Sequence, residues 1–315
     1  MTIIDFKTRL ATYKGLPSAD CFDDPELLKR HPEYRYILTT RKRGRAYVDR
    51  IRRIDSKDLG NISLLDIGCA YGGITIEAAK AGAKAVGVDV VPSYIDLARH
   101  NAKDDVDVEF FFGDMTMRTT VMQMGGRRFD TFILNHVLEH IYDTISLLEN
   151  IERIATDDAV IYFDVPNGHS ITSFRAEGHT NIFAASLAEP DCWFMFGLAN
   201  KRARIYYRKL RYFEVLFAAS GFRLILAKDA PRPRHEMEAQ LRTAMDEFRS
   251  KADSNTFEFV ERFCSEAEYD ISNASDETLD LKYFHYFWRG VAYRDESRLR
   301  MEYRNGLPIA AWGND

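Results

Sequence analysis

Short apolar runs alternate with helical stretches through the middle of the chain, and this alternation most constrains its fold. Between Ser63 and about Ala230, six apolar segments of strand length are separated, in most cases, by stretches with helical periodicity. Strands separated by helices pair in parallel through right-handed crossovers. The pattern therefore predicts an α/β fold built on an open, mostly parallel sheet. The predicted strands are SLLDIG, AVGVDV, VEFFFGD, FDTFILN, AVIYFDVP and FRLILAKDA.

Two long segments interrupt this alternation. Residues 167–205 follow the fifth predicted strand, and residues 231–282, which are acidic and helical in pattern, follow the sixth. The stretch HYFWRGVAYR, residues 285–294, then alternates like a seventh strand that returns to the sheet. We therefore interpret both long segments as insertions. The predicted organisation is an N-terminal helical cap over 1–59, a main domain over 60–295 with insertions at 167–205 and 231–282, and a C-terminal tail over 296–315.

The composition predicts a cytoplasmic protein without a membrane span. The chain of 315 residues is 46% hydrophobic, but it has no apolar run of about 18 residues and no N-terminal signal pattern. Its four cysteines lie far apart and form no CxxC pair. This argues against a disulfide framework or a structural zinc site and fits a reducing compartment.

The charge is unevenly distributed around a net value of −5. Residues 29–53 carry ten Lys and Arg against two acids, and residues 201–211 carry six basic residues and no acid. Residues 236–280 hold thirteen acids and four bases. Such runs either form solvated helix faces or contact a charged partner, and two basic runs make an anionic partner worth considering. The acidic segment is a candidate lid or homodimer contact.

The stretch LLDIGCAYGG, residues 64–73, predicts a nucleotide-binding turn. In an open α/β sheet, ligands bind outside the carboxyl ends of the strands. Gly68 and Gly72 permit positive φ and a close approach of the backbone to a ligand. Asp66 at the strand end can accept hydrogen bonds from an ammonium group. Asp89 ends the second strand, where an acid can hold both ribose hydroxyls of an adenosine.

Two cofactors fit such a turn. A dinucleotide site requires G-x-G-x-x-G, but the aligned residues are Gly68, Ala70 and Gly73, so the middle glycine is missing. The other interpretation requires an acid at the end of each of the first three strands. Asp66, Asp89 and Asp114 fill these positions.

The ordered motifs LLDIGCAYGG, AVGVD, GDM and FDTFILNHVLEHI resemble the class I S-adenosylmethionine-dependent methyltransferases. The resemblance covers roughly residues 60–230 and the late strand at 285–294. It implies a Rossmann-like seven-stranded sheet with helices on both faces, an antiparallel last strand, and S-adenosylmethionine as cofactor.

The resemblance also implies roles for individual residues. Where the family more often has glycine, this chain has Ala70, whose methyl group is tolerable if φ at this position is negative. The implied cofactor-binding residues are Asp66, Gly68, Ala70 and Gly72 at the methionine end, Asp89 at the ribose, Val90, Asp114 and Met115 around the adenine, and Asn135 facing the methionine and the acceptor.

The segment NHVLEHI supplies candidate catalytic residues. A helix starting here would make His136 and His140 i, i+4 neighbours, with Glu139 beside them. Either histidine could act as a general base. Alternatively, the group binds a divalent metal ion that polarises an acceptor hydroxyl. A third interpretation is that the Glu-His pair caps the helix and shapes the acceptor wall.

The metal hypothesis follows from a second resemblance. Ubiquinone-pathway O-methyltransferases and small-RNA terminal 2′-O-methyltransferases hold a divalent ion with E-x-x-E-H and a later histidine. Here His136 replaces the first glutamate, and His179 in FRAEGHTNIF is the candidate for the later ligand. Mixed histidine and carboxylate ligands favour zinc, manganese or iron over magnesium. His169 is a further candidate at the pocket rim, or a simple loop residue.

The segment 167–213 suggests the acceptor, because it combines arginines with many aromatic residues. Such residues can stack on a ring and pair with its anionic groups, or they can form an ordinary packed cap. We therefore expect O-methylation of a small anionic metabolite, sugar or glycan precursor. The alternatives are a nucleic acid acceptor and a non-catalytic cofactor-binding scaffold. The aromatic residues are Phe174, Phe183, Trp193, Phe194, Phe196, Tyr206, Tyr207, Tyr212 and Phe213.

Overall fold

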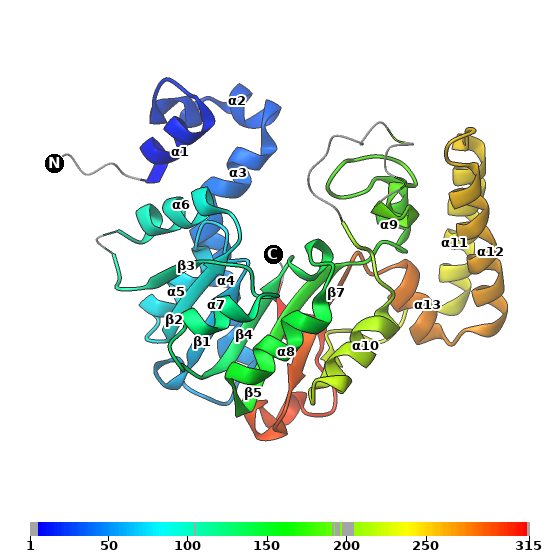
Figure 1. Cartoon of the computed structure of the whole chain (residues 1–315). Helices are drawn as coiled ribbons and strands as arrows, with labels where there is room; N and C mark the ends of the chain where they lie inside the picture. Colours follow the sequence, from blue (N-terminus) through cyan, green and yellow to red (C-terminus); the bar gives the residue numbers. More distant parts are fainter. Residues whose placement is uncertain (1–5, 104, 191, 193–195, 197–204, 314–315) are drawn as a thin grey trace.

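A seven-stranded sheet forms the centre of the protein. The structure, a computed structural model, describes residues 6–103, 105–190, 192, 196 and 205–313. The strand order is β3-β2-β1-β4-β5-β7-β6, and only β7 runs antiparallel to its neighbours. This confirms the predicted α/β class and the antiparallel last strand (Figure 1). The strands are β1 (Ser63–Ile67), β2 (Lys84–Asp89), β3 (Glu109–Phe112), β4 (Phe129–Asn135), β5 (Ala155–Pro166), β6 (Arg223–Leu226) and β7 (Phe287–Tyr293).

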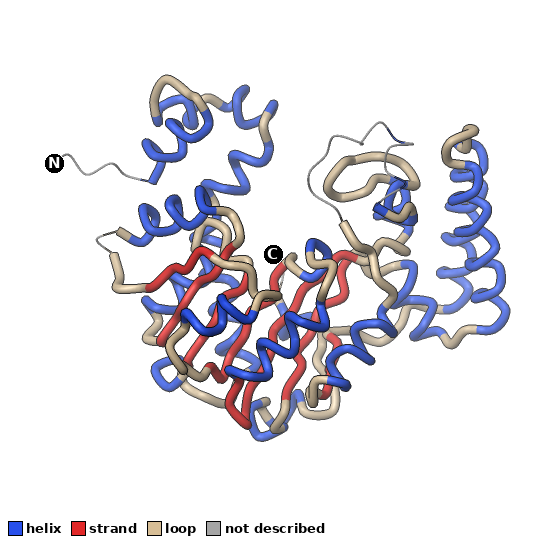
Figure 2. The backbone as a smooth tube through the Cα atoms, viewed as in Figure 1, coloured by secondary structure: helices blue, strands red, loops and turns tan. Residues whose placement is uncertain are grey.

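Helices cover both faces of the sheet because successive strand residues point to opposite sides. Leu65 packs on one face, against the helices α7 (Arg118–Gln123), α8 (Thr144–Ile154) and α10 (Leu210–Ala219). Its neighbour Leu64 packs on the other face, against α4 (Thr40–Ile54) and α5 (Gly73–Lys80). Figure 2 shows the strands enclosed between these two layers. No helix within the described residues is long and apolar enough to cross a membrane.

The helix α4 lies directly against α5 and the cofactor turn. A Cβ atom on Gly44 would lie 2.1 Å from the carbonyl oxygen of Gly73, so this contact requires glycine. Several arginines of the basic run 29–53 hold α4 in place. Arg41 forms an ion pair with Glu77 of α5, and the buried Arg50 donates to the carbonyl oxygen of Trp312. These basic side chains are therefore occupied within the chain.

The N-terminal helices pack over the cofactor turn and α6 (Pro92–Ala102). They are α1 (Phe6–Lys14), α2 (Pro25–Arg30) and α3 (Pro32–Leu38), and proline at the first helical position helps to start α2 and α3. Leu10 and Tyr34 share a small apolar core with Tyr71 of the turn and Leu97 of α6. The N-terminal segment thus covers one side of the predicted cofactor site (Figure 1).

The two predicted insertions join into one lobe with its own apolar core. The helices α9 (Ile171–Arg175), α11 (Arg234–Lys251), α12 (Phe257–Asn273) and α13 (Asp276–Tyr283) pack around Phe174, Phe248 and Phe263. We call this substructure the insertion lobe; it lies at the right of Figure 1. Many of its acids form ion pairs on the lobe itself, as Glu247 does with Arg175. The remaining short helices are η1 (Ala19–Asp23), η2 (Leu59–Asn61), η3 (Leu138–His140), η4 (Ala185–Leu187), η6 (Glu296–Arg298), η7 (Met301–Tyr303) and α14 (Ile309–Trp312).

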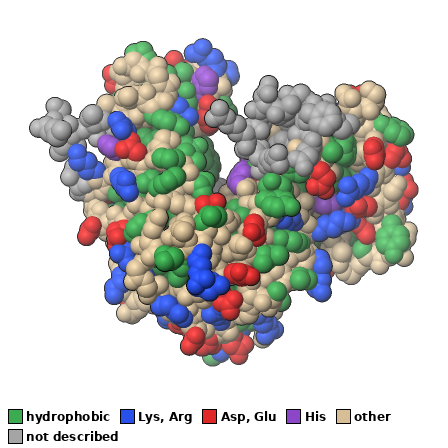
Figure 3. Space-filling model, in the orientation of Figure 1, with side chains coloured by type: hydrophobic (Ala, Val, Ile, Leu, Met, Phe, Trp, Pro, Cys, Tyr) green, Lys and Arg blue, Asp and Glu red, His purple; other side chains and the backbone are tan. Residues whose placement is uncertain are grey.

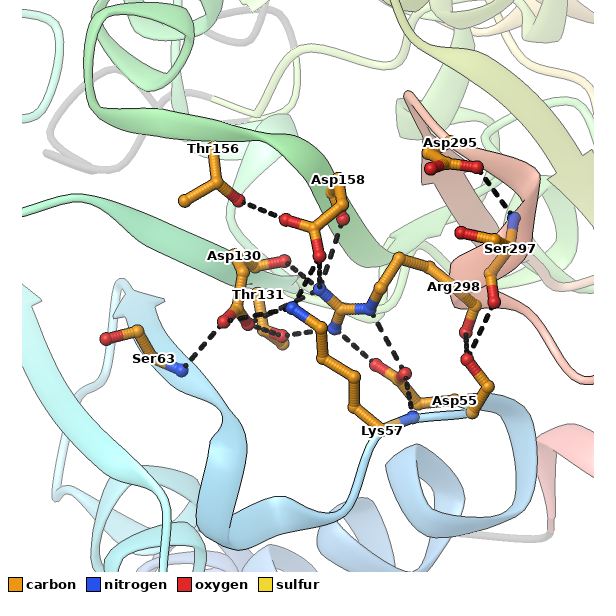
Figure 4. Close-up of polar contacts among 11 residues, drawn as sticks. Asp55, Lys57, Ser63, Asp130, Thr131, Thr156, Asp158, Asp295, Ser297 and Arg298 are labelled. Atoms are coloured by element: carbon orange, nitrogen blue, oxygen red, sulfur yellow. Dashed lines mark hydrogen bonds and ion pairs between the residues drawn. The ribbon is translucent and has the colours of Figure 1, made fainter.

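The C-terminal segment completes the core of the main domain through Arg298. This side chain is only 2% exposed and lies below the amino ends of β4 and β5 (Figure 4). It donates to both carboxylate oxygens of Asp55, at 2.5 and 3.2 Å, and to the hydroxyl of Thr131 at 3.0 Å. It also donates to the carbonyl oxygens of Asp130 and Asp158, each at 3.1 Å. The residues 296–313 are therefore part of the packed domain.

Candidate active site

The turn after β1 has a backbone conformation that brings its amide groups close to Asp89. Gly68 and Gly72 adopt φ values of 71° and 74°, which glycine permits because it has no Cβ atom. A Cβ atom on Gly68 would lie 2.4 Å from a methyl group of Val137, which excludes any larger residue without rearrangement. The carboxylate of Asp89 accepts from the amides of Ala70 and Val91, each at 2.9 Å. These contacts fix Asp89 at the carboxyl end of β2.

The condition of a negative φ at Ala70 is not met. Its φ is +45°, in the left-handed region that disfavours residues with a Cβ atom. The hydrogen bond from its amide to Asp89 and the two flanking left-handed glycines account for this conformation. The chain therefore carries backbone strain in the turn that the family usually builds with glycine.

Replacing Ala70 with glycine is expected to raise the free energy of unfolding by about 1 kcal/mol, because the left-handed strain is removed. Urea denaturation measures the change. The matched control Ala239→Gly, at an exposed position inside α11, is expected to lower the same quantity by about 1 kcal/mol. Equal destabilisation by both substitutions would contradict the assigned strain.

Two buried carboxylates lie beside the turn. Asp66 is 2% exposed, and burial raises its pKa to about 7 although the Thr75 hydroxyl donates to it at 2.6 Å. Burial also raises the pKa of Asp89, and the amides of Val91 and Ala70 oppose this change. A cationic ligand group near Asp66 would offset the free-energy cost of burying its charge.

The other predicted cofactor residues lie around the carboxyl ends of β2, β3 and β4. Val90 is 56% exposed, and the exposed Asp114 accepts from the amide and hydroxyl of Thr116 at 2.8 Å. The side chain of Met115 is buried in the main core. Asn135 ends β4 and is half-buried. Phe112, which the sequence analysis did not select, is 55% exposed at the end of β3.

The segment NHVLEHI does not begin an α-helix. The amide of His136 donates to the carbonyl oxygen of Asp164 and so extends the pairing of β4 with β5. His136 then adopts a φ of 55°, which turns the chain into the short helix η3. Its ring packs edge-on against Phe287, with ring centres 4.9 Å apart. His136 and His140 are therefore not neighbours on one face of an α-helix.

A buried carboxylate and two histidines form the centre of the candidate site. Glu139 is fully buried, and neither carboxylate oxygen has a hydrogen-bond partner within the described part of the chain. Its Oε1 atom lies 3.7 Å from Nδ1 of His136 and 4.0 Å from Nε2 of His140. Glu139, His140 and His179 each place one potential ligand atom within 4.8 Å of the others. Because a buried carboxylate without a hydrogen bond is costly, this arrangement suits a cation.

A second buried carboxylate, Glu177, holds His179. Its Oε1 atom accepts from Nδ1 of His179 at 2.9 Å and from the hydroxyl of Tyr207. Burial alone would raise the pKa of Glu177, but hydrogen bonds from His179, Tyr207 and Thr180 lower it to about 2. The sequence analysis missed Glu177 as a functional candidate, since its partner Tyr207 lies far along the chain.

Arg208 fixes the turn that carries Glu139. The guanidinium donates to the carbonyl oxygens of Leu138, Ile141 and Tyr142 at 3.1, 2.8 and 2.7 Å. The amide of Tyr206 donates to the carbonyl oxygen of Glu139 at 2.7 Å. This basic residue, which the sequence offered as a contact for an anionic acceptor, therefore has a structural role.

The rest of the aromatic and basic segment divides between core and surface. Phe174 and Phe213 are buried in the two apolar cores, while Lys209 and Arg211 expose most of their side chains. Trp193, Phe194 and the basic residues Lys201, Arg202 and Arg204 lie outside the described residues. Figure 3 shows the molecular surface hollowed between the N-terminal helices and the insertion lobe.

Comparisons with known proteins agree with this architecture. The sequence profile of a methyltransferase-domain family matches residues 39–227, more than half of the chain. The ubiquinone biosynthesis O-methyltransferase of Actinobacillus pleuropneumoniae serotype 7 is 31% identical over 108 residues, covering 33% of this chain and 45% of that protein. The corresponding protein of Coxiella burnetii is 27% identical over 160 residues, covering 50% and 62%. The chain thus matches less than two thirds of these relatives' length.

Solved structures are also similar. An S-adenosylmethionine-dependent methyltransferase from Mesorhizobium loti is 17% identical, with a TM-score of 0.46 and coverage of 76% of this chain and 93% of that one. The magnesium protoporphyrin IX methyltransferase of Synechocystis, determined with bound SAH, is 15% identical, with a TM-score of 0.42 and coverage of 76% of each chain.

Proposed function

Because the chain belongs to the class I S-adenosylmethionine-dependent methyltransferases, we propose that it transfers the methyl group to a hydroxyl oxygen of a small anionic acceptor. The observation that carries this proposal is the buried carboxylate of Glu139, which has no hydrogen bond within the described residues and lies beside His140 and His179. The sulfonium methyl group is already activated, so the protein's part is alignment and removal of the acceptor proton.

The cofactor occupies the carboxyl edge of β1, β2 and β3 in this proposal. The turn Gly68–Gly72, with Ala70, approaches its methionine part, and Asp66 pairs with the ammonium group. Asp89 accepts from the ribose hydroxyls, and Val90 and Asp114 lie at the adenine. Asn135 at the end of β4 lies between the methionine part and the acceptor.

The affinity for S-adenosylhomocysteine is expected to rise with pH up to about 7. Burial raises the pKa of Asp66 to about 7, so at lower pH the protonated carboxyl cannot pair with the ligand's ammonium group. The affinity should fall about tenfold for each pH unit below that value. Calorimetric titrations between about pH 5 and pH 7 measure this change, and Asp66→Asn should remove the pH dependence. An equal pH dependence in both proteins would contradict the role of Asp66.

Glu139, His140 and His179 would hold a divalent cation at the acceptor side. Such an ion, when bound, lowers the pKa of an acceptor hydroxyl. One carboxylate and two imidazoles suit zinc, manganese or iron better than magnesium. His136, whose Nδ1 lies 3.7 Å from Oε1 of Glu139, would accept the acceptor proton. Arg208 keeps the turn that carries Glu139 and His140 in place.

The acceptor class rests on two further observations. The relatives that match this chain are named as O-methyltransferases, which favours an oxygen nucleophile. The exposed Lys209 and Arg211 follow the site residue Tyr207 in the sequence and pair with Glu266 at 3.7 Å and Glu214 at 3.0 Å, and an acidic acceptor would compete with these weak surface pairs. The acceptor is therefore a hydroxylated small molecule with a carboxylate or phosphate group.

Formation of S-adenosylhomocysteine tests this proposal. The purified protein is assayed with 3,4-dihydroxybenzoate, with glucose 6-phosphate and with a short RNA, each with zinc, manganese, magnesium or a chelator. We expect turnover of a small acidic acceptor that the chelator removes and that Glu139→Gln lowers by about 10²-fold or more. Turnover of the RNA alone, with a steep salt dependence, would overturn the acceptor class. Chelator-resistant turnover that depends on His136 would replace the cation with a histidine base.

A further inference from the structure

We propose that Glu177 is a positioning residue that fixes the tautomer and direction of the His179 ring. This inference rests on the proposed function of Glu139, His140 and His179 as one site. It assigns a role to Glu177 and its partner Tyr207, which are not among the three potential metal ligands. The expected consequence is a His179 ring that is oriented before any ligand arrives.

The hydrogen bond between Glu177 and His179 determines which ring nitrogen carries the proton. Oε1 of Glu177 lies 2.9 Å from Nδ1 of His179, and an ionised carboxylate can only accept. Nδ1 must therefore carry the hydrogen, and in the neutral ring Nε2 keeps its lone pair. Since Nδ1 is occupied, Nε2 is the nitrogen available to Glu139 and His140. A carboxylate behind a ligating histidine raises ligand basicity and fixes ring orientation in metal sites.

Glu177 can impose this geometry because it is itself held on both oxygens. The amide of His179 donates to Oε1 and Oε2, each at 3.0 Å, and the amide of Thr180 donates to Oε2 at 2.7 Å. The hydroxyl of Tyr207 also donates to Oε1. The side chain is fully buried, so water does not compete for these bonds. A fixed carboxylate thus determines the position of a half-exposed ring.

The ring orientation matters because His179 and His140 meet edge to face. Their ring centres lie 5.1 Å apart at an interplanar angle of 88°. A half-turn of the His179 ring would place Cδ2 where Nδ1 lies and Cε1 where Nε2 lies, so that a carbon instead of a nitrogen would face the site. The bond to Glu177 opposes this exchange.

Nitrogen NMR of the histidine side chains in the metal-free protein tests the inference directly. The signals of His179 are assigned by their loss in His179→Gln. We expect a single Nδ1–H tautomer for His179 in the unmodified protein and a mixture of tautomers in Glu177→Gln. The matched control Glu189→Gln changes the same charge at an exposed position of the same segment and should leave the tautomer unchanged. An unchanged tautomer in a folded Glu177→Gln protein would overturn the inference.

Titration with zinc or manganese gives the second readout. Glu177→Gln is expected to weaken cation binding by about 10- to 100-fold, whereas Glu189→Gln should not. If Glu177→Gln fails to fold, Tyr207→Phe replaces it, because this variant keeps the hydrogen bonds from the backbone amides to Glu177. We expect it to give a mixture of His179 tautomers and to weaken cation binding several-fold. An unmodified protein that binds neither cation would refute the cation site of the proposed function, while the tautomer measurement still decides the role of Glu177.

Discussion

Replacing Asp89 with alanine is expected to weaken the binding of S-adenosylhomocysteine by about 10²- to 10³-fold. The carboxylate lies at the end of β2, where the amides of Ala70 and Val91 hold it at 2.9 Å. Hydrogen bonds to a charged group contribute about 1.5–3 kcal/mol each, and this carboxylate faces two ribose hydroxyls in the proposed complex. Isothermal titration calorimetry measures the loss.

Two variants separate this effect from a general loss of structure. Asp96→Ala removes a half-exposed carboxylate of α6 that pairs with Arg9, and it should leave the affinity for S-adenosylhomocysteine unchanged. Asp89→Asn keeps the size of the side chain but not its charge, and should give an intermediate affinity. Unchanged affinity in a folded Asp89→Ala protein would refute the assignment of the ribose site.

Replacing Arg298 with methionine is expected to lower the free energy of unfolding by about 3–5 kcal/mol. The guanidinium is buried and satisfies both oxygens of Asp55, which is itself 1% exposed. Without Arg298, the carboxylate of Asp55 stays buried without its counter-charge, and removal of one partner from such a pair is strongly destabilising. Urea denaturation measures the change.

The double variant Arg298→Met with Asp55→Leu distinguishes loss of charge compensation from loss of packing. Removing both charges should restore part of the stability, because Asp55 no longer leaves a buried charge and Asp130, which lies 3.4 Å from the guanidinium, keeps Lys57 as a cationic partner. The control Arg300→Met, at an exposed position two residues away, should stay within about 0.5 kcal/mol of the unmodified protein. An Arg298→Met protein as stable as this control would contradict the proposed role of the buried pair.

The fold was predictable from sequence because its signals are local. Alternating apolar runs located all seven strands, including β7, and the order of motifs gave a family resemblance that the profile match confirms. The cofactor turn was also recognisable, since Gly68 and Gly72 are glycines at the positions that adopt positive φ. The conformation of Ala70 was not, because it depends on a hydrogen bond to Asp89 on another strand.

The proposed acceptor side was predicted only in part, because its geometry depends on distant segments. The sequence named Glu139, His140 and His179, which the fold brings together, but it left the shape of the turn at His136 open. It gave no indication that Tyr207 would hold Glu177, or that Arg208 would cap the turn of Glu139. These contacts form only when the insertion segments pack against the main domain. A short stretch of sequence does not predict that packing.

In the proposed complex, Glu139, His140 and His179 hold a divalent cation beside the bound cofactor. Native mass spectrometry after incubation with S-adenosylhomocysteine and zinc or manganese tests it in one experiment. The unmodified protein should carry one cofactor and one metal ion, and Glu139→Gln should keep the cofactor and lose the metal. Spectra in which both proteins carry the cofactor and the same number of metal ions would contradict the claim.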